Sequence, residues 1–435
     1  MLNIASLRFV RRASSALCVF LLAALLSACA HPTPPDARQS KSWIVDNVMG
    51  KSTAELYADA IAPAVFERSG SKVIDDYTVE SGNLKMPDNS VGSLVTVRSK
   101  DGSLTAVVER PGKNGLLVVN SKGESRFTPF PAWDYSLPDT LLEQAKSYDS
   151  KSKTMAGPYV IDMLVGFSQS AVTANGGDAH ALALEQVESV NLALRNSLVN
   201  NVSVRLVGVQ IVEQNYSVTG ETLGKLPEIF SAGMKKFDPD LLYGIFSGSP
   251  DDTAGGWAYV GGRFAIGHFG GAFRHEVGHN AGGGHCHVPG GRYNYGFQNG
   301  KTTTAQCGNE SPYYSTPAVR DAHGLLIGNA ATADMARVWR ENAQRLSSYT
   351  VSSPKNFRNT GSTAFTATFA WDPSPDAVKY TIYFTSPTAP TPVKTAENVT
   401  ATTYTARVMS NRTLYYAKAV DAQGRESILS DGASK

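Results

Sequence analysis

The sequence lacks a strong excess of charge of either sign. Its 435 residues carry a formal net charge of +2, with 40 Lys and Arg against 38 Asp and Glu. Three of these charges, Arg8, Arg11 and Arg12, lie in a segment that we expect to be removed, which leaves the rest close to neutral. This balance gives no support to nucleic-acid binding or to broad electrostatic adhesion to membranes. Internal repeats and long low-complexity tracts are also absent from the sequence.

A long apolar run is also missing at the N-terminus, where Ala16 to Leu26 is too short to span a bilayer comfortably. With the basic residues before it, this run predicts an export signal over residues 1–28. The following Leu26-Ser27-Ala28-Cys29 resembles a bacterial lipobox, so we expect Cys29 to carry a lipid and residues 29–40 to form a Pro-rich tether. The absence of Asp after Cys29 resembles the pattern sorted to an outer membrane. Ordinary cleavage at a small-x-small site, giving a periplasmic or secreted protein, is the alternative.

Cysteine is scarce, with four residues in the whole chain. Cys18 lies inside the expected signal and Cys29 at its end, so Cys286 and Cys307 remain. An even pair in an exported chain predicts a single disulfide between them.

Three folded parts are expected from the length and from the changes in pattern along the chain. Residues 41–150 show short alternating runs with Gly turns and predict a small β-rich domain. Residues 157–350 alternate strand and helix patterns, which favours an α/β (α+β) domain with a mixed sheet. Residues 354–435 predict an all-β sandwich.

A metal-binding pattern lies in the run His275-Glu276-Val277-Gly278-His279-Asn280-Ala281-Gly282-Gly283-Gly284-His285. Positions i and i+4 share one face of a helix, so His275 and His279 can reach one metal ion. Gly282 lets the chain leave the helix abruptly, and His285 can return as a third ligand. Three nitrogen ligands with an open position are typical of catalytic Zn²⁺. Glu276 is then placed to act as the general base on a water molecule.

With this run, residues 158 to about 350 resemble the reprolysin-like metzincin zinc peptidases, and more closely the group that contains peptidyl-Asp metalloendopeptidases. The stretch Tyr313-Tyr-Ser-Thr-Pro317 contributes to the resemblance. It implies His275, His279 and His285 as zinc ligands and Glu276 as general base. The C-terminal part, with Trp371 and Tyr415 to Glu426, looks like a fibronectin type III domain.

One feature departs from the family, which normally carries a Met in a tight turn beneath the metal. The corresponding stretch, Lys301 to Cys307, has none, and Met335 is expected in a closing helix instead. A Cys286–Cys307 disulfide is expected to hold this turn. Tyr313 and Tyr314 are candidates for lining the substrate pocket, with ordinary packing as the alternative.

Residues 41–150 are expected to act as a prodomain, or otherwise as a permanent accessory domain. They contain no Cys, so a thiolate cannot silence the metal from there. Inhibition would require a carboxylate such as Asp134, seated by Trp133, or a segment lying in the active site. The polar linker from Lys146 to Lys153 is the expected cleavage region.

The sequence therefore predicts an exported, zinc-dependent metalloendopeptidase acting on proteins or peptides. A surface binding or adhesion protein with a vestigial peptidase domain is the alternative from another class. Hydrolysis of a non-protein amide, such as a cell-wall crosslink, is a third option. Substrate preference and oligomeric state do not follow from the sequence.

Overall fold

The computed structural model describes residues 41–44, 61–135, 137–142, 158–270, 272–287, 292–347, 349–374, 377–407, 412–422 and 424–435. These residues belong to one unit that runs from Lys41 to Lys435. The predicted signal, Cys29 with its expected lipidation and the linker from Lys146 to Lys153 lie outside the described residues. Among the described helices, none is both long and apolar enough to cross a membrane.

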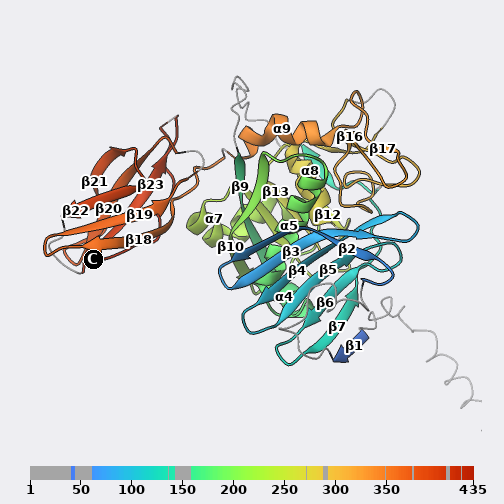
Figure 1. Cartoon of the computed structure of the whole chain (residues 1–435), viewed down its shortest axis with the longest axis horizontal. Coiled ribbons are helices and arrows are strands. Elements are labelled where there is room, and N and C mark those ends of the chain that lie inside the picture. Colours follow the sequence, from blue (N-terminus) through green and yellow to red (C-terminus); the bar gives the residue numbers. More distant parts are fainter. Residues whose placement is uncertain are drawn as a thin grey trace, which may run out of the picture. The chain divides into compact units, whose positions relative to one another are not determined.

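An antiparallel sheet of seven strands forms the first part of the described chain (Figure 1). Its order is β1-β7-β6-β5-β4-β3-β2, and each strand pairs with a neighbour in sequence except that β1 joins β7. Buried Leu84, Leu94, Val108 and Leu117 form the core on one face, because alternate residues of a strand point the same way. The strands are β1 (Lys41–Ile44), β2 (Val65–Ile74), β3 (Tyr77–Lys85), β4 (Val91–Ser99), β5 (Leu104–Glu109), β6 (Gly115–Val119) and β7 (Glu124–Pro129).

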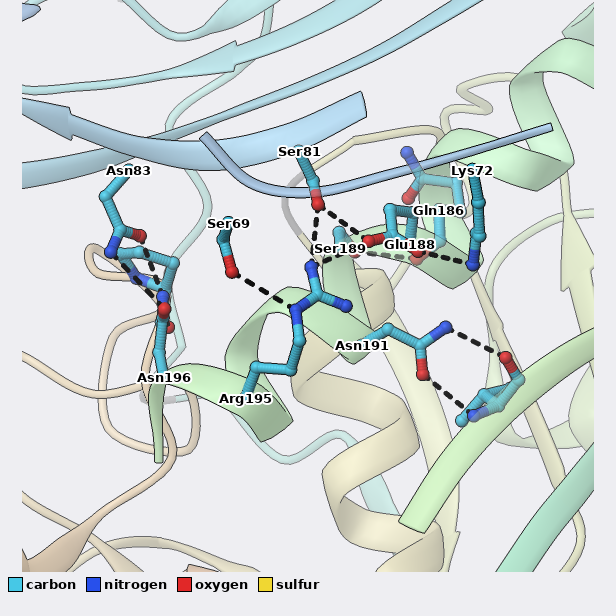
Figure 2. A network of polar contacts seen from close by, with 12 residues as sticks. Ser69, Lys72, Ser81, Asn83, Gln186, Glu188, Ser189, Asn191, Arg195 and Asn196 are labelled. Atoms are coloured by element: carbon cyan, nitrogen blue, oxygen red, sulfur yellow. Dashed lines mark hydrogen bonds and ion pairs between the residues drawn. The ribbon is translucent and has the colours of Figure 1, made fainter. Parts of the chain in front are cut away.

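This sheet also packs against α5 (Ala179–Asn196). The contact contains both apolar and charged side chains. Val79 and Val97 of the sheet pack on Leu184 of the helix. Beside them, the buried carboxylate of Glu188 accepts a hydrogen bond from Ser81 at 2.6 Å. It also forms ion pairs with Lys72 at 2.7 Å and Arg195 at 2.8 Å (Figure 2). The sheet is thus fixed to the part of the chain that follows it.

A six-stranded sheet in the order β10-β9-β11-β13-β12-β8 forms the middle of the chain. β10, β9, β11 and β13 run parallel to one another, and β12 is antiparallel to β13. β8, which precedes this part in sequence, adds to the outer edge of β12. The strands are β8 (Thr140–Leu142), β9 (Tyr159–Ser168), β10 (Val202–Val212), β11 (Leu241–Ile245), β12 (Gly256–Val260) and β13 (Phe264–Gly267).

Five further helices and four short strands complete this middle part. Buried residues of α5, α8 and α9 share one core with β9 and β11. The helices are α4 (Gln169–Ala174), α6 (Gly220–Ile229), α7 (Ser231–Phe237), α8 (Phe273–Ala281) and α9 (Met335–Leu346), and the strands are β14 (Gly284–Cys286), β15 (Tyr295–Gly296), β16 (Thr316–Arg320) and β17 (Leu326–Ile327).

The C-terminal part consists of two three-stranded antiparallel sheets around one core that contains Phe369, Trp371 and Tyr415. The first sheet has the order β18-β19-β22 and the second β21-β20-β23. The strands are β18 (Lys355–Ser362), β19 (Thr366–Asp372), β20 (Lys379–Ser386), β21 (Ala389–Val399), β22 (Thr403–Arg407) and β23 (Leu414–Val420).

The expected fold class, with an α/β (α+β) metzincin-like domain, is wrong. Strands make up 42% and helices 18% of the described residues, spread over several sheets. The alternation of strand and helix patterns over residues 157–350 did not reveal the short strands β14 to β17, which lie in the loops of this part.

Candidate metal centre

The helix α8 carries His275, Glu276 and His279 on buried positions. It ends at Gly282, whose φ of 115° places it in the left-handed region that favours glycine. The amide of Gly282 donates to the carbonyl of His279 at 2.8 Å, which closes the last turn. The chain reverses there and enters β14, which brings His285 back toward the helix.

The first two histidines are oriented by backbone carbonyls. Nδ1 of His275 lies 2.7 Å from the carbonyl oxygen of Ala305, and Nδ1 of His279 lies 2.8 Å from that of Gly283. These contacts assign the proton to Nδ1 and leave the Nε2 lone pair of each ring available as a ligand. The two Nε2 atoms are 3.0 Å apart. Burial and the neighbouring His275 lower the pKa of His279 to about 3, which favours the neutral, ligating form.

The turn beneath these rings is tied to the strand that carries His285. A disulfide joins Cys286, next to His285, with Cys307, next to Gln306. The Gln306 side chain is fully buried, and its amide nitrogen lies 3.4 Å from Nδ1 of His279. The disulfide therefore links the third histidine to the turn that supports the first two.

A fourth group comes from far earlier in the chain. Oδ1 of Asp139, the residue before β8, lies 2.7 Å from Nε2 of His285, and Oδ2 lies 3.5 Å from Nε2 of His275. One ligand atom from each of Asp139, His275, His279 and His285 lies within 4.8 Å of the others. These four buried or half-buried side chains can hold a metal ion.

Unpaired polar atoms support this assignment. Within the described chain, Oδ1 of Asp139 and Nε2 of His285 are buried without a hydrogen-bond partner, although they lie 2.7 Å apart. Their short contact is therefore not aligned as a hydrogen bond, as expected for two atoms directed at one ion. Burial alone would raise the pKa of Asp139, but the imidazoles of His275, His285 and His279 lower it below its ordinary value. The carboxylate is therefore ionised and able to ligate.

Glu276 lies beside this group without belonging to it. Its side chain is buried, and within the described chain Oε2 has no hydrogen-bond partner. Burial and the charge of Asp139 raise the pKa of Glu276 well above its ordinary value. The carboxylate fits closely against Gly256 of β12, where a Cβ atom would stand 2.4 Å from Oε1 of Glu276. Glycine at position 256 thus makes room for the Glu276 side chain.

Met335 contacts the metal-binding loop, although it was expected only in the closing helix. It begins α9, is fully buried and packs on the turn between the second and third histidines. A Cβ atom at Gly283 would stand 2.6 Å from its Cε atom. Because the carbonyl of Gly283 accepts from His279, this packing fixes a group that orients a ligand.

Tyr313 and Tyr314, the candidates for substrate binding, make packing and backbone contacts near α8. Tyr314 is fully buried, and its hydroxyl donates to the carbonyl of Arg274 at 2.9 Å, so it supports α8 from within the core. Tyr313 is half-buried, and its carbonyl accepts from the amide of Ala305. The sequence left ordinary packing open as the alternative for both residues, and the contacts of Tyr314 are those of a packing residue.

Asp134, named from the sequence as an example of a carboxylate that could reach the metal, is exposed, and the carboxylate that lies at the histidines is Asp139. Trp133 stacks on His268, with ring centroids 4.7 Å apart and parallel planes. Tyr135 lies against His275, with centroids 4.9 Å apart. No local motif marks Asp139 in the sequence, because its role depends on a contact across the fold.

Comparisons with known proteins identify no family. No family model and no curated protein matches the chain. A solved chaperone–substrate complex is similar over 58% of this chain at 23% identity, with a TM-score of 0.39, and the match spans 41% of that chain. An Fn3-like protein from Clostridium thermocellum is similar over 19% of this chain and 88% of its own, at 26% identity and a TM-score of 0.18. A titin module from human cardiac muscle matches 19% of this chain at 15% identity and a TM-score of 0.18. These likenesses are too weak to carry an argument about function.

Proposed function

We propose that this protein is an exported zinc-dependent endopeptidase that hydrolyses peptide bonds of protein substrates. The observation that carries the proposal is the convergence of His275, His279 and His285 beside the unpartnered carboxyl group of Glu276. The motif in α8 and its resemblance to metzincins add support. The proposal depends on the side chains of the site and not on the fold class.

Zinc is the metal that suits these ligands best. Neutral imidazoles and a carboxylate whose ligand atoms lie within 4.8 Å of one another are a typical zinc ligand set. When bound, zinc would polarise a substrate carbonyl and lower the pKa of a water molecule toward neutrality. His275, His279 and His285 would hold the ion, and a position for water would be open only where Asp139 does not ligate.

Glu276 supplies the proton transfers. Its carboxylate accepts a proton as the oxygen of water forms a bond to the peptide carbonyl carbon. When the carbon–nitrogen bond breaks, the same proton passes to the leaving nitrogen, and the products are a carboxylic acid and an amine.

The strand β12 offers backbone groups to which an extended polypeptide could bind. It lies next to the edge of the middle sheet, where only the short β8 is outside it, and Gly256 at its start contacts Glu276. A substrate can pair with such a strand through backbone hydrogen bonds. These bonds require an extended conformation and do not depend on the side chains. We therefore expect unfolded proteins to be better substrates than folded ones.

A second candidate is a binding protein in which the metal only stabilises the fold. The observation in its favour is Asp139, because four protein ligands close a metal site as they do in structural zinc centres. Under this reading, Asp139 would be needed for metal binding and Glu276 would have no chemical task. The two candidates differ in what they predict for these residues.

The test compares the zinc-loaded full chain with its Asp139→Ala and Glu276→Gln variants on denatured casein. The peptidase proposal predicts hydrolysis, by the parent chain or by Asp139→Ala, that a chelator stops and that Glu276→Gln in the same chain lowers by about 10²-fold or more. Glu276→Gln should retain one zinc ion per chain, since Glu276 is not a ligand. The contrary result is that neither the parent chain nor Asp139→Ala, both loaded with zinc, shows hydrolysis that depends on Glu276. The metal would then have a structural role only.

A further inference from the structure

The stretch that leads into and includes β8 lies against the metal centre. We define the inhibitory segment as residues 130–135 and 137–142. Phe130 packs edge-on against Phe269, with ring centroids 6.1 Å apart, and Trp133 stacks on His268. Tyr135 covers His275, and Asp139 reaches the Nε2 atoms. This short segment therefore contacts the residues around α8 at four successive points.

Backbone pairing adds to these side-chain contacts. β8 pairs with β12 in parallel, with Thr140 opposite Ala258 and Leu142 opposite Val260. The amide of Ala258 donates to the carbonyl of Asp139 at 2.9 Å. The hydrogen-bonding edge of β12 that a polypeptide substrate would need is thus already occupied.

From these contacts we propose that the inhibitory segment keeps the enzyme latent, with Asp139 as a removable fourth ligand in the position that water must take. This inference rests on the proposed peptidase function and concerns the regulation of the same site. A catalytic zinc site needs an open position, and a fourth protein ligand fills it. Asp139 blocks the metal while β8 blocks the substrate edge, so both requirements for hydrolysis are absent together.

The seven-stranded sheet holds the segment in place. Glu109, the last residue of β5, forms a 3.0 Å ion pair with the buried Arg274, which directly precedes His275. Ser93 of β4 donates to the same carboxylate at 2.6 Å. Together with the Glu188 contacts in Figure 2, this pair anchors the sheet on both α5 and α8. The segment begins directly after β7, so its effective concentration at the metal is high.

Access to the metal can be measured without any hydrolysis. The full chain is loaded with Co²⁺, and acetohydroxamate is titrated while the visible absorption of the ion is recorded. We expect the hydroxamate to bind the Asp139→Ala variant at least ten times more tightly than the parent chain. Asp134→Ala is the matched control, because it removes an exposed carboxylate of the same segment, and it should behave as the parent.

Hydrogen exchange provides a second measurement on the same proteins. The amide of Ala258 should exchange faster in Asp139→Ala than in Asp134→Ala, because it donates to the backbone of the inhibitory segment. Asp139→Asn, which keeps the shape of the side chain, should give an intermediate response in both measurements and guards against a folding defect.

Three results would overturn the inference. One is equal hydroxamate affinity in the parent chain and Asp139→Ala, and another is loss of Co²⁺ from both Asp139 variants, which would make Asp139 a structural ligand. Equal hydrolysis by the two chains would also refute latency while leaving the peptidase function intact. Tighter hydroxamate binding to Asp139→Ala without hydrolysis would support the segment as a cover of the metal and refute the peptidase function.

Discussion

Asp139 and His285 meet at 2.7 Å although they belong to different parts of the chain, one just before β8 and the other in β14. Each residue also approaches the pair on α8, so the centre depends on three separate segments. α8 and β14 follow one another closely in sequence, and the Cys286–Cys307 disulfide ties β14 to the turn whose Ala305 carbonyl orients His275. Asp139 has no such covalent support, which is why it is the ligand that we expect to leave.

Metal binding should depend on His279 and not on the neighbouring His287. We expect His279→Ala to lower zinc affinity by more than the roughly 10–100-fold that loss of an outer-shell partner costs. His287→Ala is the control, since His287 lies close in sequence but outside the ligand group. Zinc titration with a competing chelator measures both variants. Similar affinities in the two would remove His279 from the ligand set.

The disulfide should support the metal centre. In the Cys286→Ser/Cys307→Ser double variant we expect the free energy of unfolding to fall by about 2–4 kcal/mol, the usual range for a lost disulfide. Zinc affinity should fall as well, because the bond links His285 to the turn under His275. Urea unfolding and zinc titration measure these changes, and reduction of the parent chain should reproduce them. Unchanged zinc affinity would show that the turn holds its place without the bond.

Gly256 should be required for the position of Glu276. In the Asp139→Ala background, Gly256→Ala should slow hydrolysis by roughly 10²-fold, since a displacement of about 1 Å can cost that much. The new Cβ would stand 2.4 Å from Oε1 of Glu276. Gly248→Ala is the control, because a Cβ there meets no atom within 4 Å. Zinc content should be equal in both variants, and equal rates would contradict the assigned role of Glu276.

The contact between the first sheet and α5 should weaken as the pH rises. Glu185 of α5 is fully buried, and both of its carboxyl oxygens lack a partner within the described chain. Burial raises the pKa of Glu185 well above its ordinary value, and the charge of Asp178 adds to this effect. The folded protein therefore holds a proton that the unfolded chain releases, so stability is fully present below the unfolded pKa and is lost as the pH rises toward the folded one.

This linkage gives a slope of up to about 1.4 kcal/mol per pH unit for one group. Glu185→Gln should remove the slope and raise the midpoint of thermal unfolding at pH 8 more than at pH 4. Glu221→Gln is a suitable control, because Glu221 is exposed on α6. A parallel pH dependence in the parent chain and Glu185→Gln would show that Glu185 does not hold this proton.

The sequence predicted those parts of the site that depend on local geometry. The four-residue spacing of His275 and His279 and the glycine at position 282 determine a helix, its end and the return of the chain, and α8 confirms them. The alternation of patterns over residues 157–350 also indicated strands, and β9 and β11 are continuous apolar runs of this part. Local periodicity is sufficient in these cases because neighbouring residues decide the outcome.

Long-range contacts could not be predicted in this way. The parallel pairing of β8 with β12 brings Asp139 to the histidines, and no pattern around Asp139 indicates that pairing. Met335 contacts Gly283 only because α9 packs beside the metal-binding loop. The fold class was wrong for a related reason, since short strands such as β15 and β17 arise from pairing partners and not from their own sequence.

The most direct test of the account is the rate of casein hydrolysis by zinc-loaded Asp139→Ala, with and without Glu276→Gln in the same chain. Asp139→Ala opens the metal centre while all three histidines remain, so we expect it to cleave casein faster than the parent. Adding Glu276→Gln should lower that rate by about 10²-fold or more, with zinc still bound. An Asp139→Ala chain that binds zinc but cleaves no faster than its Glu276→Gln double variant would contradict the account.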